Sequence, residues 1–278
     1  MKKRGICILI FFTILLFLDV YLPQNLKEEL QFQENIQKDH MIEQIRDQQI
    51  SLEMQENLLQ EAGEEKETYP QLLLGYFCCD TENIWEIRRY TERFRRRASR
   101  EFEEYSNILA AVWNDLDCFP VPESDRNPDA GVSYGDSWMQ GRSFGGNRRH
   151  EGCDIMADLN VRGVYPVLSI TDGTIEKIGW LKLGGYRIGI RSPSGAYFYY
   201  AHLASYATDF KEGDPVTSGT LLGFMGDTGY SEIEGTTGNF DVHLHVGIYV
   251  MGTDGKEWSV NPYWVLRSLE TRKRVYHF

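Results

Sequence analysis

From about residue 143 onward, short apolar runs alternate with turn signals. The runs are rich in Val, Ile, Tyr and Phe, and they stop at Gly, Pro, Ser or Asp. We expect strands at 164–170, 174–180, 186–191, 196–202, 221–226 and 241–250. Strands of this length and spacing are typical of an antiparallel all-β sandwich or barrel. The pattern predicts a β domain over residues 143–270 that ends in a short helix, 262–269, capped by Asn261.

The residues before this domain have a helical pattern, so the whole chain is expected to be α+β. From residue 27 to 68 the sequence is polar, rich in Gln and Glu and free of Pro, with apolar residues near heptad spacing. This predicts a stalk over 23–68, an extended helix or weak coiled coil that offers a surface for self-association. Apolar residues at steps of three and four predict a helical module at 69–118. Prolines and glycines then predict a linker at 119–142.

The N-terminus predicts a membrane anchor. Three basic residues, 2–4, precede an apolar run at 6–18, which reaches residue 22 if Asp19 is tolerated in the bilayer. No small-x-small cleavage site follows, which favours a retained single-pass anchor at 1–22 over a signal peptide that is removed from a secreted protein. Basic residues before an anchor stay in the cytoplasm, so the rest of the chain is expected outside the cell membrane.

The charge of the chain argues against nucleic acid as a partner. The sequence has 29 Lys and Arg against 41 Asp and Glu, a formal net charge of −12 at neutral pH. A general nucleic-acid binder needs a basic patch that displaces counterions. Residues 28–67 alone hold 12 acidic and 3 basic side chains, so most of the acidity belongs to the expected stalk.

Five cysteines are present, one of them, Cys7, in the expected anchor. The other four permit three disulfide pairings, and all four could equally be reduced and buried. No C-x-x-C pair occurs, so a zinc site built from cysteines is not expected.

Histidine is scarce, and most of it lies in the β domain. Of six histidines, His40 falls in the stalk and His277 in the tail. His243 and His245 are separated by one residue in an expected strand, so both side chains project from the same face. Packing alone rarely explains two adjacent imidazoles on one face, so we expect them to line a functional site.

The remaining histidines supply further metal-ligand types. His150 and Asp154 are four residues apart, and His202 ends an aromatic strand. Three protein ligands and an open position make a catalytic zinc site, which would leave one or two histidines for proton transfer. A competing interpretation compares residues 150–154 with the helical H-E-x-x-H motif, with Glu151 as the base. Gly152 weakens a helix there, and this interpretation leaves the 243/245 pair unused.

Together these motifs resemble the M23 family of zinc metallopeptidases, the lysostaphin and LytM type. The resemblance covers about residues 143–250, and its motifs are specific in combination. They are His150-Glu151-Gly152-Cys153-Asp154, Tyr200-Ala201-His202-Leu203, Leu222-Gly223-Phe224-Met225-Gly226-Asp227-Thr228-Gly229 and His243-Leu244-His245.

The resemblance implies a role for each residue. His150, Asp154 and His245 would bind one Zn²⁺ per chain. His202 and His243 would be catalytic, acting on the water nucleophile and on the tetrahedral oxyanion. The implied substrates are stem or cross-bridge peptides of peptidoglycan, which an anchored enzyme with a stalk would meet outside the membrane.

Three features depart from the family pattern. Cys153 stands where a residue without a thiol is usual, and its side chain is expected to face away from that of Asp154. Asn147, Arg148 and Arg149 lie just before the first histidine and are candidates for binding stem-peptide carboxylates. The extended segment 231–240 is expected to alter one wall of the groove.

Three functions are compatible with the sequence. The first is a membrane-anchored zinc endopeptidase acting on peptidoglycan, which all five site residues favour. The second is a non-catalytic M23-like module that activates other wall hydrolases or forms part of an envelope or sporulation assembly. The third is a zinc-binding or glycan-binding adhesin, which would need no histidines for proton transfer.

Overall fold

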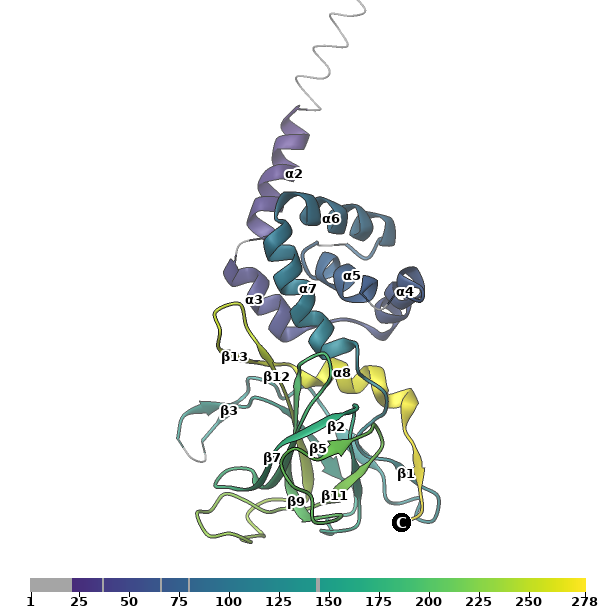
Figure 1. Ribbon diagram of the computed structural model, residues 1–278, viewed down its shortest axis with the longest axis vertical. Helices are drawn as coiled ribbons and strands as arrows, with labels where there is room; N and C mark the ends of the chain where they lie inside the picture. The colour runs from purple at the N-terminus through teal and green to yellow at the C-terminus, as the bar shows by residue number, and fades with distance from the viewer. Residues whose placement is uncertain (1–21, 37, 66, 80, 144–145) are drawn as a thin grey trace, which may run out of the picture. The chain divides into compact units, whose positions relative to one another are not determined.

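The computed structural model describes residues 22–36, 38–65, 67–79, 81–143 and 146–278 (Figure 1). The chain forms two compact units, residues 1–44 and 45–278. The first unit contains α2 (Leu22–Asn35) and most of α3 (Lys38–Asp47). The predicted anchor, except for its last residue, lies outside the described residues. Across the described part of the chain, no helix combines the length and apolar character needed to cross a membrane.

The predicted stalk is interrupted, which corrects the expectation of one extended helix. After α3 the backbone of Gln48 has a left-handed φ of 54°. A new helix, α4 (Leu52–Ala62), starts at the N-cap Ser51, whose side chain accepts a hydrogen bond from the Met54 amide at 3.1 Å. The buried Gln48 side chain accepts a hydrogen bond from Trp113 Nε1 at 2.7 Å. Residues from 45 onward therefore belong to the second unit.

Three helices follow, in agreement with the helical pattern of the sequence. They are α5 (Thr68–Phe77), α6 (Ile84–Arg97) and α7 (Ser99–Trp113). Helix α5 contacts α4, α6 and α7. At its closest approach to α6, a Cβ on Gly75 would meet the Thr91 hydroxyl oxygen at 1.9 Å. The absence of a side chain at Gly75 therefore sets how closely these two helices pack.

The segment predicted as a linker contributes strands to the β domain. It contains β1 (Glu123–Ser124), β2 (Val132–Tyr134) and β3 (Gly141–Arg142). β2 pairs with β5, β3 pairs with β4 (Arg148–Arg149), and β1 runs parallel to β14 (Val275–Tyr276). Gly135 directly follows β2, and Pro122 directly precedes β1, so short strands alternate with residues typical of loops.

The predicted antiparallel β domain is confirmed. Its main sheet has ten strands, with the path β10-β7-β8-β9-β12-β5-β2, while β11 pairs with β6 and β9, and β13 with β12. Every pairing within it is antiparallel. The remaining strands are β5 (Cys153–Ala157), β6 (Pro166–Leu168), β7 (Gly173–Leu181), β8 (Gly185–Arg191), β9 (Tyr197–Tyr206), β10 (Pro215–Val216), β11 (Leu221–Met225), β12 (His243–Met251) and β13 (Glu257–Val260).

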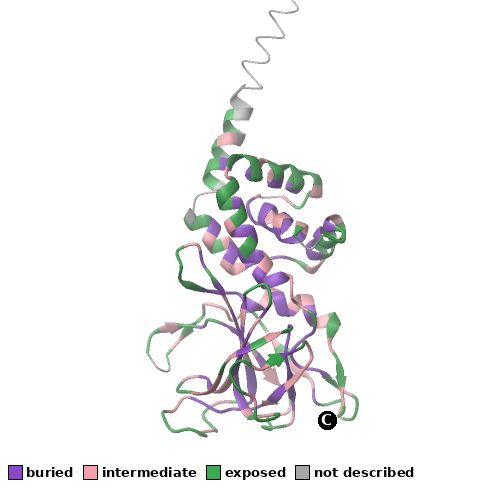
Figure 2. Ribbon diagram, viewed as in Figure 1, coloured by how far each residue is buried: buried purple, intermediate pink, exposed green. Residues whose placement is uncertain are grey.

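Strand β12 lies at the centre of the sheet and carries its core. It pairs with β5 on one side and β9 on the other, and Leu244, Val246 and Ile248 on it are fully buried. Figure 2 shows buried residues along the central strands and on the inner faces of the helices. Helix α8 (Pro262–Leu269) follows β13, and the Asn261 side chain caps it by accepting a hydrogen bond from the Tyr263 amide. Helices α7 and α8 both contact β12.

Candidate metal centre and groove

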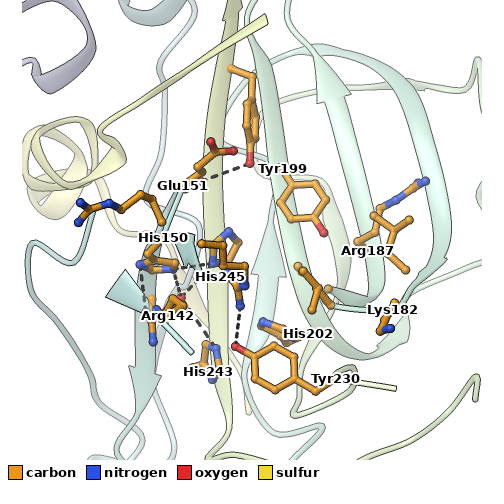
Figure 3. Close-up of a pocket in the computed structure, with 18 of the residues that line it drawn as sticks. Arg142, His150, Glu151, Lys182, Arg187, Tyr199, His202, Tyr230, His243 and His245 are labelled. Atoms are coloured by element: carbon orange, nitrogen blue, oxygen red, sulfur yellow. Dashed lines mark hydrogen bonds and ion pairs between the residues drawn. The ribbon is translucent and has the colours of Figure 1, made fainter. Parts of the chain in front are cut away.

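Three candidate ligands meet where β5 and β12 pair. His150 directly follows β4 and lies three residues before the start of β5, Asp154 lies on β5, and His245 lies opposite Asp154 on β12. His150 Nε2, His245 Nδ1 and Asp154 Oδ1 form a triangle whose three edges all measure 3.0 Å (Figure 3). A metal ion can be bound by His, Cys, Asp or Glu side chains whose ligand atoms lie close together. Among the described residues, His150, Asp154 and His245 form such a group, with ligand atoms all within 4.8 Å of one another.

His243 lies two residues before His245 on β12 and faces the same space. Its Nε2 is 3.9 Å from Asp154 Oδ1. Leu244, between the two histidines, points into the core and is fully buried. The alternation of a strand thus gives one face two imidazoles and the other face a core residue.

His202 faces the same space because strand β9 is irregular at this residue. Tyr199 and Ala201 on β9 line the groove, whereas Tyr200 is fully buried on the other side. Regular alternation would place His202 on the buried side with Tyr200. Instead its backbone has a left-handed φ of 63°, and the pairing of β9 with β8 and β11 shifts register around it. A non-glycine residue held in this conformation often marks a functional site.

Backbone carbonyls fix the orientation of three of the imidazoles. In each, Nδ1 faces a carbonyl oxygen, and the pairs are His150–Ser137 at 2.9 Å, His202–Thr228 at 2.8 Å and His243–Asp241 at 2.7 Å. A carbonyl oxygen only accepts hydrogen bonds, so Nδ1 of His202 and of His243 carries a proton and donates it. Nε2 of these two rings is then left as an acceptor directed at the site. Nδ1 of His150 also lies 3.0 Å from Arg142 Nη2.

Burial and hydrogen bonding control the charges of the site. Burial raises the pKa of Asp154, but hydrogen bonds with His150 and His245 outweigh it and hold this pKa well below its usual range. Burial lowers the pKa of His202, and the neighbouring His243 and His245 lower it further. Burial also lowers the pKa of His245, against the opposing effect of Asp154. At neutral pH the centre therefore combines the ionised carboxylate of Asp154 with the neutral imidazoles of His202 and His245.

Arg142, which the sequence analysis missed, holds the second oxygen of Asp154. Its guanidinium Nη2 donates a hydrogen bond to Asp154 Oδ2 at 2.6 Å, while Oδ1 faces the imidazoles. Arg142 lies on the β3–β4 pair, in a segment expected to be a linker. Hydrogen bonds of this kind orient metal ligands in proteins.

The triangle lies in a groove of about 1010 Å³. Aromatic side chains form much of its lining, namely Tyr197, Tyr199, Tyr230, Phe240 and Tyr249. The Tyr199 and His245 ring centroids are 5.8 Å apart, and those of Phe240 and His202 are 4.6 Å apart. A Cβ on Gly184 would lie 2.1 Å from the Tyr199 hydroxyl oxygen, so this glycine leaves the space that Tyr199 occupies. Phe240 ends the extended segment 231–240, which therefore contributes to a wall of the groove.

Of the three predicted substrate-binding residues, two line the groove and one does not. Arg148 and Arg149 line the groove, whereas Asn147 is exposed and is not part of the lining. Arg148 Nη2 donates to the Tyr230 hydroxyl at 3.1 Å, and Arg149 Nη1 donates to a backbone carbonyl at 3.2 Å. The two arginines therefore lie in the groove with partners of their own chain, and Asn147 lies outside the groove.

The structure excludes the helical interpretation of residues 150–154 and places the Cys153 thiol away from the candidate metal centre. Residues 150–152 are not helical and β5 begins at Cys153, so the H-E-x-x-H interpretation with Glu151 as base does not apply. The fully buried Cys153 thiol donates to the Gly135 carbonyl oxygen, away from Asp154, as expected. Burial also raises the pKa of this thiol, so Cys153 is not a thiolate ligand.

The donor set fits a divalent transition metal such as zinc. Zinc binds imidazole nitrogen and carboxylate oxygen at about 2.0–2.2 Å. A tetrahedral site with such bonds separates neighbouring donors by about 3.3 Å, close to the 3.0 Å edges of this triangle. Catalytic zinc sites use three protein ligands, which is the number that the triangle supplies.

Comparisons with known proteins agree with this geometry. The family model described as peptidase family M23 matches residues 148–262. The L-Ala–D-Glu endopeptidase of Bacillus subtilis is 43% identical over 207 residues, 73% of this chain and 59% of that protein. The glycyl-glycine endopeptidase ALE-1 of Staphylococcus capitis is 37% identical over 89 residues, 31% of this chain and 22% of that protein. The chain therefore spans less than two thirds of the length of either endopeptidase.

A solved structure extends the similarity over most of the chain. It is a crystal structure from Ruminococcus gnavus, provisionally described as a glycyl-glycine endopeptidase LytM. It is 41% identical in sequence, with a TM-score of 0.74. The match covers 89% of this chain and 98% of the crystallised one, so it includes helices as well as the β domain.

Proposed function

This chain belongs to peptidase family M23, and on that basis we propose that it is a zinc endopeptidase that hydrolyses peptide bonds of peptidoglycan. The observation that carries the proposal is the convergence of five side chains at one point of the groove. Two imidazoles and a carboxylate form the 3.0 Å triangle, and His202 and His243 direct Nε2 toward it.

The metal ion and the protein side chains would have different roles in hydrolysis. His150, Asp154 and His245 would hold the ion, which supplies Lewis-acid activation of water and of the scissile carbonyl when bound. Arg142 keeps Oδ1 of Asp154 directed at the ion by binding Oδ2. Asp154 and His245 come from two paired strands, so the sheet fixes the spacing of these two ligands.

His202 and His243 would move protons during hydrolysis. Each donates its Nδ1 proton to a carbonyl oxygen, so Nε2 is free to accept a proton from the attacking water. A protonated Nε2 can then donate to the leaving amine or stabilise the oxyanion. His202 is kept neutral by burial, which suits a group that begins the cycle as an acceptor.

The substrate class follows from the family and from the two endopeptidase relatives. One relative is named for an L-Ala–D-Glu bond and the other for a glycyl-glycine bond. We propose that this chain acts on stem or cross-bridge peptides of the cell wall. The groove, whose lining includes Tyr199 and Tyr230 beside the histidines, suits a peptide.

We also propose that the protein acts outside the cell membrane, held by residues 1–22, and that the stalk region, residues 23–68, supports self-association. The support is the basic N-terminus and the apolar run that follows it. A substrate that lies outside the membrane requires this orientation. Protease added to intact spheroplasts should then degrade the β domain; if it is protected, the placement is wrong.

The proposal is tested with the purified chain from residue 25, zinc analysis and isolated wall sacculi. We expect one zinc per chain and release of soluble muropeptides. His245→Ala should lose both metal and activity, because it removes a ligand. His243→Ala should keep most of the zinc and lose activity by at least about 100-fold, as expected for loss of a proton-transfer group.

His277→Ala is the matched control, because His277 is exposed and lies outside the groove. It should leave both zinc content and activity unchanged. A wild-type protein that binds zinc but cleaves no wall peptide would instead indicate the non-catalytic M23-like module. A protein that binds glycan without needing His202 or His243 would indicate an adhesin.

A further inference from the structure

Among the described residues, one cation of the groove has neither a hydrogen bond nor an ion pair. Six basic side chains line the groove. Five of them are engaged: Arg142 with Asp154, Arg148 with Tyr230, Arg149 with the Met139 carbonyl, Lys177 with Glu212 and Lys182 with Glu232. The sixth is Arg187, on β8. Within the described part of the chain its guanidinium has neither an ion pair nor a hydrogen bond, and its Nη1 is buried without a partner.

The backbone holds Arg187 firmly beside the catalytic centre. The Tyr206 hydroxyl donates to the Arg187 carbonyl oxygen at 2.9 Å and accepts from the Gly179 amide at 3.0 Å. Gly179 is the cross-strand neighbour of Arg187 on β7 and has no side chain to cover it. On the other side, Arg187 lies where the β8–β9 register shifts past His202.

The Arg187 side chain lines the same groove as the candidate metal centre. In Figure 3, Tyr199 stands between His245 and Arg187. Tyr199 and Arg187 both line the groove, and the charge of Arg187 opposes the rise that burial causes in the pKa of Tyr199. A substrate whose scissile bond lies at the metal would therefore bring a neighbouring residue to Arg187.

A half-buried guanidinium without a partner favours an anionic ligand. Leaving a buried donor unsatisfied is costly, whereas a carboxylate can accept two parallel hydrogen bonds from one guanidinium. The anionic group that a wall peptide offers is a carboxylate, and a glycine bridge carries none on its side chains. Arg187 therefore distinguishes between the two substrate types for which the endopeptidase relatives are named.

We propose that Arg187 is a specificity-determining residue that binds the free carboxylate of an acidic residue, such as D-Glu, next to the scissile bond. The proposal rests on the proposed endopeptidase function and adds its substrate preference. It predicts that the protein prefers acidic stem peptides to glycine bridges.

The test compares two synthetic peptides that differ in one charge. Both contain the L-Ala–D-Glu bond, and in the second the free carboxyl of D-Glu is a carboxamide. With zinc-loaded wild-type protein, we expect kcat/KM for the acid to exceed that for the amide by about 10- to 100-fold, the range of a charge-assisted hydrogen bond. Pentaglycine should be the poorest of the three substrates.

Variants at Arg187 should remove this preference selectively. Arg187→Gln should bring the acid-to-amide ratio to within about threefold, mainly by raising KM for the acid, and leave kcat/KM for the amide unchanged. Arg187→Lys should keep part of the ratio, because it retains the charge but not the planar fork. Lys182→Gln is the matched control, since that groove cation already pairs with Glu232, and it should keep the wild-type ratio.

The two proposals fail in different ways. Equal hydrolysis of acid and amide by the wild type, an unchanged ratio in Arg187→Gln, or a preference for pentaglycine would overturn the role of Arg187 and leave the endopeptidase function standing. If the wild type hydrolyses no peptide, the endopeptidase function fails. In that case the affinities of the same two peptides, measured by calorimetry, test the role of Arg187. Equal affinities for the acid and the amide would refute carboxylate binding.

Discussion

His202 and His245 are buried imidazoles whose neutral form is part of the folded state. Burial lowers the pKa of both, and for His202 the neighbouring His243 and His245 add to the effect. In the unfolded chain a histidine has a pKa of about 6.5. The folded state therefore binds fewer protons than the unfolded state just below that pH.

The free energy of unfolding of the metal-free protein should consequently fall as the pH drops below about 6.5. The unfolded chain gains protons first, so stability rises with pH in this window and is fully present above it. Each such histidine contributes a slope of at most about 1.4 kcal/mol per pH unit. Urea unfolding of chelator-treated protein between pH 5 and 7.5 measures the slope.

Replacing His202 by Gln removes one histidine that takes up a proton on unfolding. The slope should therefore decrease by up to about 1.4 kcal/mol per pH unit. The same change at the exposed His277 should leave the slope as it is in the wild type. A slope that is identical in His202→Gln and wild type would contradict the burial argument.

Single residues of the site differ in how far the sequence could predict them. His243 and His245 were predictable, because a spacing of two on a strand needs no tertiary information. Arg142 was not, because its contact with Asp154 depends on pairing between two-residue strands in a segment with loop composition. The role of His202 was inferred from a resemblance, since its strand pattern alone points it into the core.

At the scale of elements, the β7–β8 hairpin fixes the position of His202 through its contact with Thr228. Gly185 begins β8 with a left-handed φ of 62°, and a Cβ there would lie 2.3 Å from the Thr228 carbonyl oxygen. That same carbonyl accepts the Nδ1 proton of His202 at 2.8 Å. Gly185 of the hairpin therefore packs against Thr228, and Thr228 in turn orients His202.

Gly185→Ala should destabilise the fold and also reduce activity. The left-handed conformation costs an alanine about 1–2 kcal/mol, and the contact with the Thr228 carbonyl adds to this cost. Displacing Thr228 should also release His202 and lower kcat. Urea unfolding and muropeptide release measure the two effects.

Gly195→Ala is the matched control for this variant. Gly195 also has a left-handed φ, 104°, but a Cβ there would meet nothing within 4 Å. It should show the conformational cost alone, with unchanged kcat. If the two variants lose equal stability and neither loses activity, Gly185 does not support His202.

The elements themselves were largely predictable where a regular pattern continued for five residues or more. The expected strand at 186–191 corresponds to β8, and that at 241–250 to β12. The break of the stalk at Gln48 was not predictable, because no glycine or proline marks it. Its buried hydrogen bond with Trp113, 65 residues away, compensates for the interruption.

At the scale of the whole molecule, the end of α3 is joined to the β domain through Arg46. Its Nε donates to the Ser259 carbonyl oxygen at 2.9 Å, and its Nη2 donates to the Ser259 hydroxyl at 3.1 Å. Its own carbonyl accepts from the Asn261 amide at 2.7 Å, and its guanidinium lies 5.5 Å from the Trp138 ring centroid. These contacts bridge 213 residues of sequence, so no local pattern could predict them.

Arg46→Ala should lower the free energy of unfolding by about 1.5–3 kcal/mol, the range for hydrogen bonds to a charged group. Urea unfolding followed by circular dichroism measures the change. Arg88→Ala is the comparison, because its side chain is 63% exposed and pairs on the surface with Glu61. That variant should lose no more than about 1 kcal/mol. Equal losses would mean that the Arg46 contacts add nothing beyond a surface ion pair.

The carbonyl contacts of the histidines have a consequence for the rate of the reaction. Protein dipoles that are already oriented toward a reacting centre need no reorganisation when charge develops there. His202 and His243 are oriented by carbonyls of their own chain, which are present before metal or peptide binds. The free-energy cost of aligning these rings is therefore met once, when the chain folds, and does not recur in each catalytic turnover.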